Sequence, residues 1–269
     1  MIPTESEIAN QSLLAWDNWL NTAPGLYVLN WEQAQFNRAV DDAFGFDALQ
    51  IGFPQVGCLN ENRISNRWLM QLPSQPKVDL SSNYGVHTIC QGSIYDLPFA
   101  AESMDLIALP HVLEFTANPH EALREVHRVL RPEGRIVISG FNPMSLWGMR
   151  QYYGKLFNRP FLPKEGQFIS HLRIKDWLRL LNYAIDRGKF GCYSLPLQNH
   201  RTMTTPSLLD KVGDRWWPFL GSVFMLSAIK RTPRMKLVGK ISSRRPSLSQ
   251  TLAPVTQSKT TQQTNSTND

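Results

Sequence analysis

The sequence contains little cysteine and no long apolar run, and both absences exclude whole classes of protein. Cys58, Cys90 and Cys192 are odd in number and far apart, with no CxxC pair and no histidine at ligand spacing, so neither a disulfide framework nor a zinc site is predicted. No window approaches 18 uninterrupted apolar residues, and the start of the chain lacks the basic region and apolar core of a signal peptide. We therefore expect a cytoplasmic protein without a transmembrane segment.

The sequence also lacks the short motifs of three common enzyme classes. It has no G-x-S-x-G for an acyl-transfer serine and no G-x-x-x-x-G-K-[ST] for nucleotide phosphates. A nicotinamide dehydrogenase would need G-x-G-x-x-G after its first strand and an acid about 20 residues later, and both are missing. No metal is predicted either, because five further histidines show no ligand spacing: His87, His120, His127, His171 and His200.

The net charge of +6 is concentrated at the end of the chain. Residues 231–269 hold seven of the 28 Lys and Arg residues and one of the 22 acidic residues, so the rest of the chain carries 21 of each. This end is rich in Ser, Thr and Gln and has few apolar residues, so we expect a disordered basic tail that cannot bury enough surface to fold. Arg244-Arg245 could touch an anionic partner, or the tail could be only a solvated appendage. Because the remainder is neutral, nucleic acid is not an expected partner.

What the sequence does contain is a strand, helix and strand in the middle of the chain. Leu106-Ile107-Ala108-Leu109 is an unbroken apolar run of strand length, typical of a parallel strand covered by helices on both faces. Residues 135–139 form a second such run. Together with the helix between them they predict a βαβ unit in a mostly parallel sheet.

The helix of this unit has clear boundary signals. Asn118 is a good N-cap, Pro119 suits the first helical position, and Glu121 stands where a capping-box carboxylate belongs. Pro132 and Gly134 should end the helix. Its expected buried face is one apolar stripe of helical spacing: Ala122, Leu123, Val126, Val129 and Leu130.

Three segments follow one another at a recognisable spacing: the turn Tyr95-Asp96-Leu97-Pro98-Phe99, the strand start Met104-Asp105-Leu106-Ile107, and the helix exit EALREVHRVLRPEG at 121–134. This order resembles the type-11 group of class I S-adenosylmethionine-dependent methyltransferases, in which a D/E-x-L-P-F turn, a strand and an x-E-x-x-R-V-L-x-P-G-G helix exit occur in turn. The similarity covers residues 47–184 and looks most like a poorly characterised bacterial branch of the group.

The resemblance implies an α/β fold, namely the Rossmann-like class I methyltransferase fold with N-terminal helices. Its sheet has seven strands and is mostly parallel, with an antiparallel last strand. The chain would then comprise an N-terminal helical segment (1–45), a methyltransferase-like domain (46–230) and the disordered tail (231–269).

The boundaries of the other elements are predicted from local patterns. Two helices are predicted in the N-terminal segment, because capping-box patterns occur at Thr4 with Glu7 and at Asn30 with Gln33. Pro24-Gly25 should separate the two helices, and we expect both helices to cover one sheet edge. Further strands are expected at 47–51, 66–73, 184–194 and 221–229, and a helix at 170–182.

The resemblance implies S-adenosyl-L-methionine as the cofactor, held where the first strand ends. Glycines at such a turn let the backbone approach a ligand. Here the loop is Gly52-Phe53-Pro54-Gln55-Val56-Gly57, in which Pro54 replaces the middle glycine of the family and removes one N–H. We expect the crevice still to admit the cofactor.

Two more positions depart from the family pattern. The strand at 66–73 ends without the acid that binds the ribose hydroxyls, so Gln71 or Ser74 could each accept one bond, or Asp79 could fold back. Ser93 stands in place of the aspartate that binds the adenine amino group. The softened contacts could together weaken cofactor binding by a few kcal/mol. The cofactor-binding residues that the resemblance implies are Gly52, Phe53, Gly57, Gln71, Ser93, Ile94, Leu109, Pro110 and His111.

The candidate catalytic and acceptor residues come after the strands at 106–109 and 135–139. His111, directly after the strand at 106–109, could act as a general base toward the acceptor, or its ring could hydrogen-bond the loop and line the cofactor site. The run 140–153 is aromatic, so it either packs at the sheet rim or forms an apolar acceptor pocket with Asn142, Trp147, Tyr152 and Tyr153. Residues 203–218 are long enough to form part of a lid.

The leading hypothesis is an S-adenosylmethionine-dependent methyltransferase that acts on a small, hydrophobic acceptor. The alternative is a methyltransferase-like fold that has lost catalysis and serves as a binding or regulatory module. Binding of the cofactor distinguishes the two hypotheses.

Overall fold

A computed structural model describes residues 15–16, 18–73, 75, 85–156, 167–194 and 217–232. The chain divides into two units, Met1–Pro233 and Arg234–Asp269, and every described residue lies in the first. The predicted basic tail beyond Thr232, the lid segment up to Trp216, the helix start at Thr4 and Glu7, Ser74 and Asp79 fall outside the described residues.

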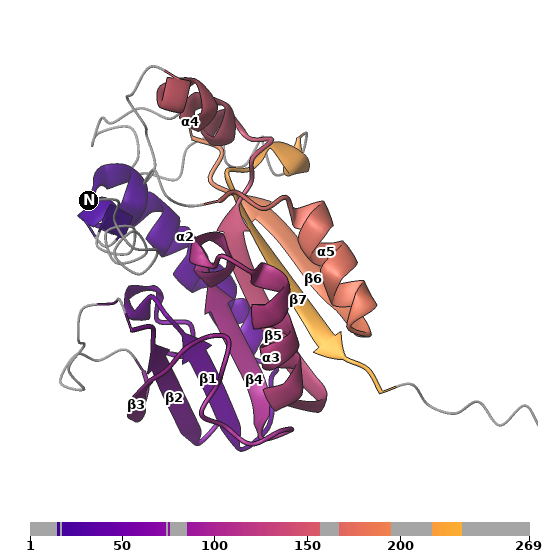
Figure 1. Cartoon of the computed structure of the whole chain (residues 1–269). Coiled ribbons are helices and arrows are strands. Elements are labelled where there is room, and N and C mark those ends of the chain that lie inside the picture. Colours follow the sequence, from indigo (N-terminus) through magenta and orange to yellow (C-terminus); the bar gives the residue numbers. More distant parts are fainter. Residues whose placement is uncertain are drawn as a thin grey trace, which may run out of the picture. The chain divides into compact units, whose positions relative to one another are not determined.

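Seven strands form one sheet in the order β3-β2-β1-β4-β5-β7-β6 (Figure 1). The pairs β3–β2, β2–β1, β1–β4 and β4–β5 are parallel, whereas β7 is antiparallel to both β5 and β6. This confirms the predicted mostly parallel sheet with its antiparallel last strand. The strands are β1 (Asp47–Ile51), β2 (Asn66–Gln71), β3 (Thr88–Gln91), β4 (Met104–Pro110), β5 (Leu130–Phe141), β6 (Tyr183–Gly191) and β7 (Val223–Lys230).

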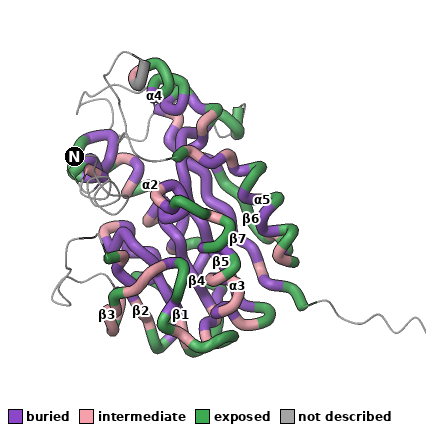
Figure 2. Tube along the Cα trace, viewed as in Figure 1, coloured by how far each residue is buried: buried purple, intermediate pink, exposed green. Residues whose placement is uncertain are grey.

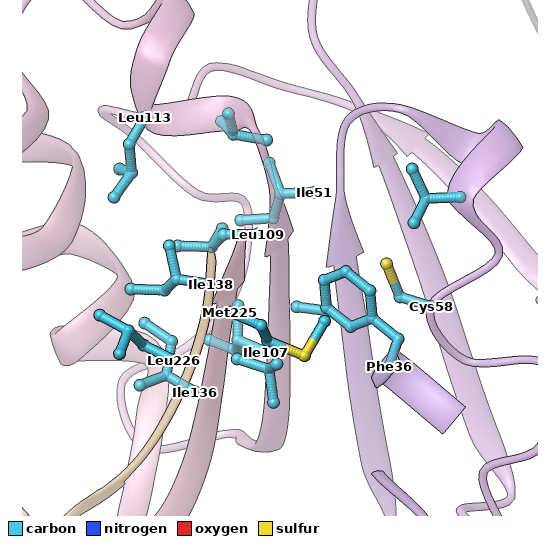
Figure 3. Close-up of a cluster of buried hydrophobic side chains, with 14 of the residues drawn as sticks. Phe36, Ile51, Cys58, Ile107, Leu109, Leu113, Ile136, Ile138, Met225 and Leu226 are labelled. Atoms are coloured by element: carbon cyan, nitrogen blue, oxygen red, sulfur yellow. The ribbon is translucent and has the colours of Figure 1, made fainter. Parts of the chain in front are cut away.

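The central strands are buried because helices cover both faces of the sheet. Leu106 to Leu109 in β4 are fully buried, as their continuous apolar run predicts. Figure 1 shows α3 (Pro119–Val129) and α5 (His171–Leu180) on one face and α2 (Ala23–Val40) on the other. Figure 2 shows the buried residues along the central strands and the exposed ones on the outer helix surfaces. Figure 3 draws part of this core, including Phe36 of α2 and Met225 of β7.

Helix α3 has its predicted start and buried stripe, but it ends earlier than predicted. Asn118 is the N-cap, although its side chain donates to Glu121 at 3.5 Å and caps no backbone N–H. The stripe Ala122, Leu123, Val126 and Val129 is buried. The helix ends at Val129, ahead of Pro132 and Gly134, because Leu130 already pairs with Met104 as the first residue of β5. Sheet pairing thus overrides the local helix signal.

The break between the two N-terminal helical segments lies at Asn21-Thr22 and not at the predicted Pro24-Gly25. Helix α2 begins at Ala23 with Thr22 as its N-cap, and the Thr22 hydroxyl accepts a hydrogen bond from the Gly25 N–H at 3.4 Å. Pro24 lies in the first turn, where its missing N–H has no intrahelical partner to lose. The Asn30 and Gln33 signal therefore lies inside a helix and does not start one.

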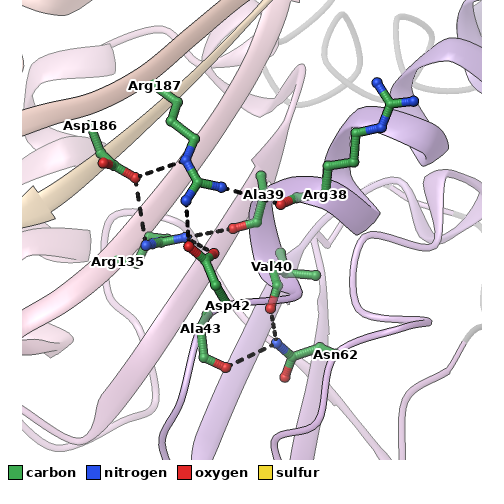
Figure 4. A network of polar contacts seen from close by, with 9 residues as sticks. All are labelled: Arg38, Ala39, Val40, Asp42, Ala43, Asn62, Arg135, Asp186 and Arg187. Atoms are coloured by element: carbon green, nitrogen blue, oxygen red, sulfur yellow. Dashed lines mark hydrogen bonds and ion pairs between the residues drawn. The ribbon is translucent and has the colours of Figure 1, made fainter.

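The C-terminal end of α2 is fixed to the sheet by a polar network (Figure 4). Arg135 of β5 and Arg187 of β6 donate to the carbonyls of Ala39 and Arg38, and both pair with Asp42. Asn62 donates to the Val40 carbonyl at 2.7 Å. These donors satisfy carbonyls that the end of a helix leaves without intrahelical partners, and the two cations favour the negative end of the helix dipole.

Two short helices complete the described part. The aromatic run after β5 is not a loop throughout, since α4 (Leu146–Leu156) contains Arg150 to Tyr153. Helix α5 begins after Ser170, whose hydroxyl accepts from the Arg173 N–H at 3.3 Å. Among the described helices, none combines the length and the apolar character needed to cross a bilayer.

Candidate active site

The loop after β1 is shaped by three residues in the left-handed region. Gly52 (φ 69°), Phe53 (φ 32°) and Gly57 (φ 58°) bracket a short 3-10 helix, η1 (Pro54–Val56). A left-handed φ costs glycine little but strains phenylalanine. Gly52 continues the sheet by donating to the Met70 carbonyl at 2.8 Å. The predicted cofactor loop thus turns sharply at the carboxyl edge of the parallel strands.

A small cradle lies next to Gly52. A Cβ at this position would approach Val112 Cγ2 to 3.1 Å and Gln75 Nε2 to 3.4 Å. Apart from its chain neighbours, the third nearest atom is Leu72 Cδ1, at 3.8 Å. Gln75 holds its own position because its Oε1 accepts from the Leu72 N–H at 3.1 Å. An amide therefore stands just past the end of β2, where the sequence offers no acid.

The other predicted cofactor residues follow the same edge. Gln71 ends β2 and is buried, with its carbonyl accepting from the Gly92 N–H at 3.1 Å. Ser93 accepts from the Tyr95 N–H at 3.2 Å, which fixes the turn, and Ile94 is buried. Leu109 and Pro110 end β4 and are buried. The structure brings the nine predicted positions to the ends of neighbouring strands β1 to β4, and their role in binding stays a prediction.

His111 lies between two buried carboxylates from different elements. Its Nδ1 is 2.8 Å from Glu114 Oε2, in the 3-10 helix η2 (Val112–Phe115), and its Nε2 is 2.9 Å from Glu32 Oε1, in α2. All three side chains are at most 4% exposed. Glu114 also accepts a hydrogen bond from the Phe141 N–H at the end of β5. His111 itself has a φ of 53°, a left-handed conformation that is uncommon for histidine.

This arrangement keeps the imidazole protonated. Burial alone would lower the pKa of His111, but the charges of Glu32 and Glu114 outweigh it and raise the pKa to about 10. Burial raises the pKa of Glu114, and the imidazolium opposes that rise. At neutral pH the His111 ring then has no free lone pair. The geometry therefore does not favour the general base that His111 was expected to supply, and it agrees with the alternative in which the ring hydrogen-bonds the loop, through Glu114.

Glu32 has an ion pair but no aligned hydrogen bond among the described residues. Its contact with His111 is short enough for an ion pair but is not aligned as a hydrogen bond, and in the described part of the chain neither of its oxygens accepts one. Cys58 follows the β1 loop. Burial raises the pKa of its thiol well above the usual value, and the Glu32 charge raises it further. A buried carboxylate with free acceptor oxygens is costly unless a cation or donor reaches it.

Aromatic rings enclose this charged cluster. Trp16 is 1% exposed, and its ring centroid lies 4.7 Å from that of His111 and 5.6 Å from that of Phe53. Phe141 lies 4.6 Å from His111 on another side. Aromatic faces attract cations, so this enclosure suits a positively charged group. The N-terminal segment thus contributes to the site itself and does more than cover a sheet edge.

The four residues predicted for an acceptor pocket separate into two pairs. Tyr152 and Tyr153 line a cavity of about 430 Å³ together with Pro143, Met149 and Phe168. In contrast, Trp147 is fully buried and donates from Nε1 to the Ser194 carbonyl at 2.7 Å. Asn142 is also buried and donates to the carbonyls of Phe219 and Gly221, so it joins the end of β5 to the start of β7.

Contacts between aromatic rings lead from the lining of the cavity to the charged cluster. Phe168 lines the cavity, and its ring lies 5.7 Å from that of Phe141, which contacts His111. Ring contacts therefore run from the lining of the cavity through Phe168 and Phe141 to His111. Aromatic side chains exclude water and hold apolar groups in place.

Several residues at this edge could not be selected from the sequence. Glu32 and Trp16 belong to the N-terminal segment, and nothing in their local pattern distinguishes them from other helix residues. Glu114 offers a weak signal, since it follows His111 by three residues on the loop after β4. Gln75 lies beyond the predicted end of β2 and could have been considered as the missing polar partner.

The residues present fit a nucleoside cofactor that carries a positive charge. The cradle beside Gly52 has a polar wall in Gln75, and the cluster beside it has an unsatisfied carboxylate in Glu32. Among the described residues, no group of three or more His, Cys, Asp or Glu side chains is arranged to hold a metal ion.

Comparison with known proteins identifies related sequences and folds. Residues 72–138 match the family model of a methyltransferase domain. The chain is 31% identical over 223 residues to YafS of Escherichia coli (strain K12), an uncharacterized protein, and the match covers 82% of this chain and 84% of YafS. It is 34% identical over 80 residues to the ubiquinone/menaquinone biosynthesis C-methyltransferase UbiE of Rubrivivax gelatinosus, but that match covers 30% of this chain and 31% of UbiE.

A solved structure supports the fold. A SAM-dependent methyltransferase from Thermotoga maritima superposes with a TM-score of 0.57 at 17% identity, covering 83% of this chain and 99% of the other. At this identity the likeness concerns the fold alone. It agrees with the Rossmann-like fold that the order of strands β1 to β7 indicates.

Proposed function

This chain belongs to the class I S-adenosylmethionine-dependent methyltransferases, and on that premise we propose that it methylates a small apolar acceptor bound in the cavity beside α4. The observation that carries the proposal is the cavity of about 430 Å³ lined by Met149, Tyr152, Tyr153 and Phe168. It opens at the carboxyl edge of the sheet, where folds of this kind bind their ligands.

S-adenosylmethionine supplies an electrophilic methyl group that is already activated by its sulfonium, so the protein mainly excludes water and aligns the acceptor. Gly52 lets the backbone approach the cofactor, and Gln75 offers an amide to its ribose. Ser93 and Ile94 border the adenine side in this proposal, as the family pattern implies. Leu109 and Pro110 form the floor between the cofactor and the core.

His111 acts in this proposal as a fixed positive charge and not as a base. Both of its nitrogens face carboxylates, and its pKa of about 10 keeps it protonated at neutral pH. It holds Glu32 and Glu114 in place across α2 and η2. An acceptor must then lose its proton to solvent or to another group, or need no deprotonation.

The apolar character of the acceptor follows from the rings that surround the cavity. Tyr152 is 74% exposed and Tyr153 is 55% exposed, so both present aromatic surface at its mouth. Phe168 closes the inner end toward Phe141. The partial similarity to UbiE, whose name refers to methylation in ubiquinone and menaquinone biosynthesis, agrees with an apolar acceptor, but it spans less than a third of either chain.

The proposal is tested by supplying S-adenosylmethionine labelled in its methyl group together with a small-molecule extract. We expect protein-dependent label in the organic phase, and mass spectrometry of that phase identifies the product. Met149→Lys places a charge in the cavity and should reduce labelling at least tenfold. Leu180→Ser, at a 79% exposed position on α5, is the matched control and should label normally.

Calorimetric titration distinguishes the possible failures. Cofactor binding without any labelled product would favour the alternative of a binding or regulatory module. No binding of S-adenosylmethionine or S-adenosylhomocysteine up to millimolar concentration would overturn the enzymatic proposal. Equal labelling by the Met149→Lys and wild-type proteins would remove the acceptor from this cavity.

A further inference from the structure

The Glu32, His111 and Glu114 side chains place two carboxylates against one imidazole. Glu32 lies 2.9 Å from His111 Nε2 and Glu114 lies 2.8 Å from Nδ1, and all three side chains are buried. In the described part of the chain, no Lys or Arg side chain pairs with either carboxylate. His111 therefore faces a second carboxylate, Glu32, in a region that water does not screen.

A purely structural role for the cluster would need less charge. One carboxylate is enough to neutralise His111, and the Glu114 contact at 2.8 Å already ties η2 to the end of β4. The second carboxylate, Glu32, adds a buried charge whose oxygens accept no hydrogen bond among the described residues. Such a charge destabilises the fold unless a further positive group compensates it.

The cluster lies at the edge assigned to the cofactor. His111 directly follows β4, and the Gln33 side chain, next to Glu32 in α2, donates to the Gln55 carbonyl in η1 at 3.1 Å. Glu32 thus stands between the β1 loop and the β4 end. The Trp16 and Phe141 rings beside His111 favour a cation further.

We propose that this buried cluster, through the extra charge of Glu32, is the counter-charge that selects the positively charged methyl donor over its neutral demethylated product. The inference rests on the proposed function, because it needs S-adenosylmethionine to bind at this edge. Transfer breaks the bond from sulfur to the methyl carbon, leaves the electron pair on sulfur and forms the new bond to the acceptor. The donor loses one positive charge in this step, so its attraction to the cluster falls and product release becomes easier.

The selectivity should be measurable because charges interact strongly where water is excluded. Glu32→Gln keeps the size of the side chain and an oxygen that can face His111 Nε2, but removes the extra charge. We expect the ratio of the dissociation constants of S-adenosylmethionine and S-adenosylhomocysteine to rise at least tenfold in this variant, which corresponds to about 1.4 kcal/mol. Sinefungin, a donor analogue with an amine in place of the methylsulfonium group, should lose affinity in parallel with the donor.

The matched control is Asp42→Asn, which removes a charge at the other end of α2, where Asp42 pairs with Arg135 and Arg187. This variant tests whether loosening α2 alone changes the ratio, and we expect a smaller change than in Glu32→Gln because Glu32 keeps its charge. Should Glu32→Gln fail to fold, Glu114→Gln removes one charge from the same cluster and gives the same reading.

The outcomes separate this inference from the proposed function. If wild type binds both ligands but Glu32→Gln weakens them equally, or leaves the ratio unchanged, the counter-charge is overturned and the methyltransferase proposal stands. If Asp42→Asn shifts the ratio as far as Glu32→Gln, the effect belongs to the packing of α2 and the inference also fails. If wild type binds neither ligand, it is the proposed function that fails.

Discussion

At the scale of single residues, two of the six described non-glycine residues with a positive φ lie at the candidate site. Phe53 and His111 both have positive φ angles and directly follow the β1 turn and β4. Each such conformation costs about 1 kcal/mol or more in a residue with a side chain. The tertiary contacts that hold them are the ring packing against Trp16 and the two ion pairs of His111. The strained positions are thus kept where two parallel strands end side by side.

Gly52→Ala tests the cradle beside β1. The new Cβ would sit at a φ of 69° and within 3.4 Å of Val112 Cγ2 and Gln75 Nε2. We predict a loss of about 1–2 kcal/mol in the free energy of unfolding, from the left-handed conformation, and at least a tenfold loss of S-adenosylmethionine affinity. Urea unfolding and calorimetry measure the two effects.

Gly85→Ala is the control for backbone strain in this prediction. Gly85 has a φ of 68° and precedes β3, and a Cβ there would meet the Asn60 Cα at 2.6 Å, so this variant should lose more stability than Gly52→Ala. The folded fraction of this variant should lose stability but bind the cofactor as wild type does. Equal loss of affinity in both variants would mean that Gly52 acts only through stability.

Residues at the site were predictable only where they follow a strand. Gly52 and His111 could be selected because each stands directly after an apolar run of strand length. Glu32 could not, since only the packing of α2 across the sheet places it 2.9 Å from His111, which is far away in sequence. The role of His111 could not be predicted from the sequence either, because the charges that raise its pKa come from Glu32 in α2 and Glu114 in η2.

At the scale of secondary structure elements, α2 is the part whose attachment decides the geometry of the site. Its C-terminal end is held by Asp42, and burial, which alone would raise the pKa of Asp42, is outweighed by hydrogen bonds from Arg135 and Arg187 that lower it. Glu32 lies further toward the N-terminus of the same helix. The network in Figure 4 therefore helps to keep Glu32 beside His111.

Asp42→Asn should loosen this attachment. Because Asp42 is 43% exposed, its pairs are screened, and we predict a loss of about 1 kcal/mol in the free energy of unfolding. Amide hydrogen exchange should quicken in the last turns of α2. Asp41→Asn is the matched control, since the Asp41–Arg63 pair is 3.8 Å long and mostly exposed, and it should change neither quantity. Unchanged protection from hydrogen exchange in the Asp42→Asn variant would contradict the role of Asp42 in anchoring α2.

Element types were predictable from the sequence, whereas several boundaries were not. The apolar stripe of α3 follows the helical period, and the apolar run of β4 has the length of a buried strand. The structure confirms both element types. The start of β5 at Leu130 depends on pairing with Met104, and the start of α2 at Ala23 depends on the Thr22 cap ahead of a proline. Both are decided by partners that a local pattern does not include.

At the scale of the whole molecule, the charged cluster joins α2 to the ends of β4 and β5. Glu32 comes from α2, His111 follows β4, and Glu114 accepts from the Phe141 N–H at the end of β5. Breaking the cluster therefore affects global unfolding as well as the site. Because His111 carries a proton in the folded state, the free energy of unfolding depends on pH.

The sign of this dependence follows from the raised pKa of His111. The folded ring keeps its proton up to about pH 10, whereas the unfolded ring releases it near 6.5. The contribution is fully present below 6.5 and is lost as the pH rises toward 10. Between pH 7 and 8 the folded state binds almost one proton more, so we predict that the free energy of unfolding falls by about 1 kcal/mol over this interval.

Denaturant unfolding at pH 7 and pH 8 measures this fall, and His111→Gln should abolish most of it. The interval lies above the titration of His127 and His171, whose pKa values burial lowers, and below that of Cys58, whose pKa burial raises. If the variant does not fold, ring proton resonances of wild-type His111 give the same answer, because a protonated ring should not titrate between pH 6 and 8. A resonance that titrates near 6.5, or an equal slope in the variant, would show that the two carboxylates do not hold the proton.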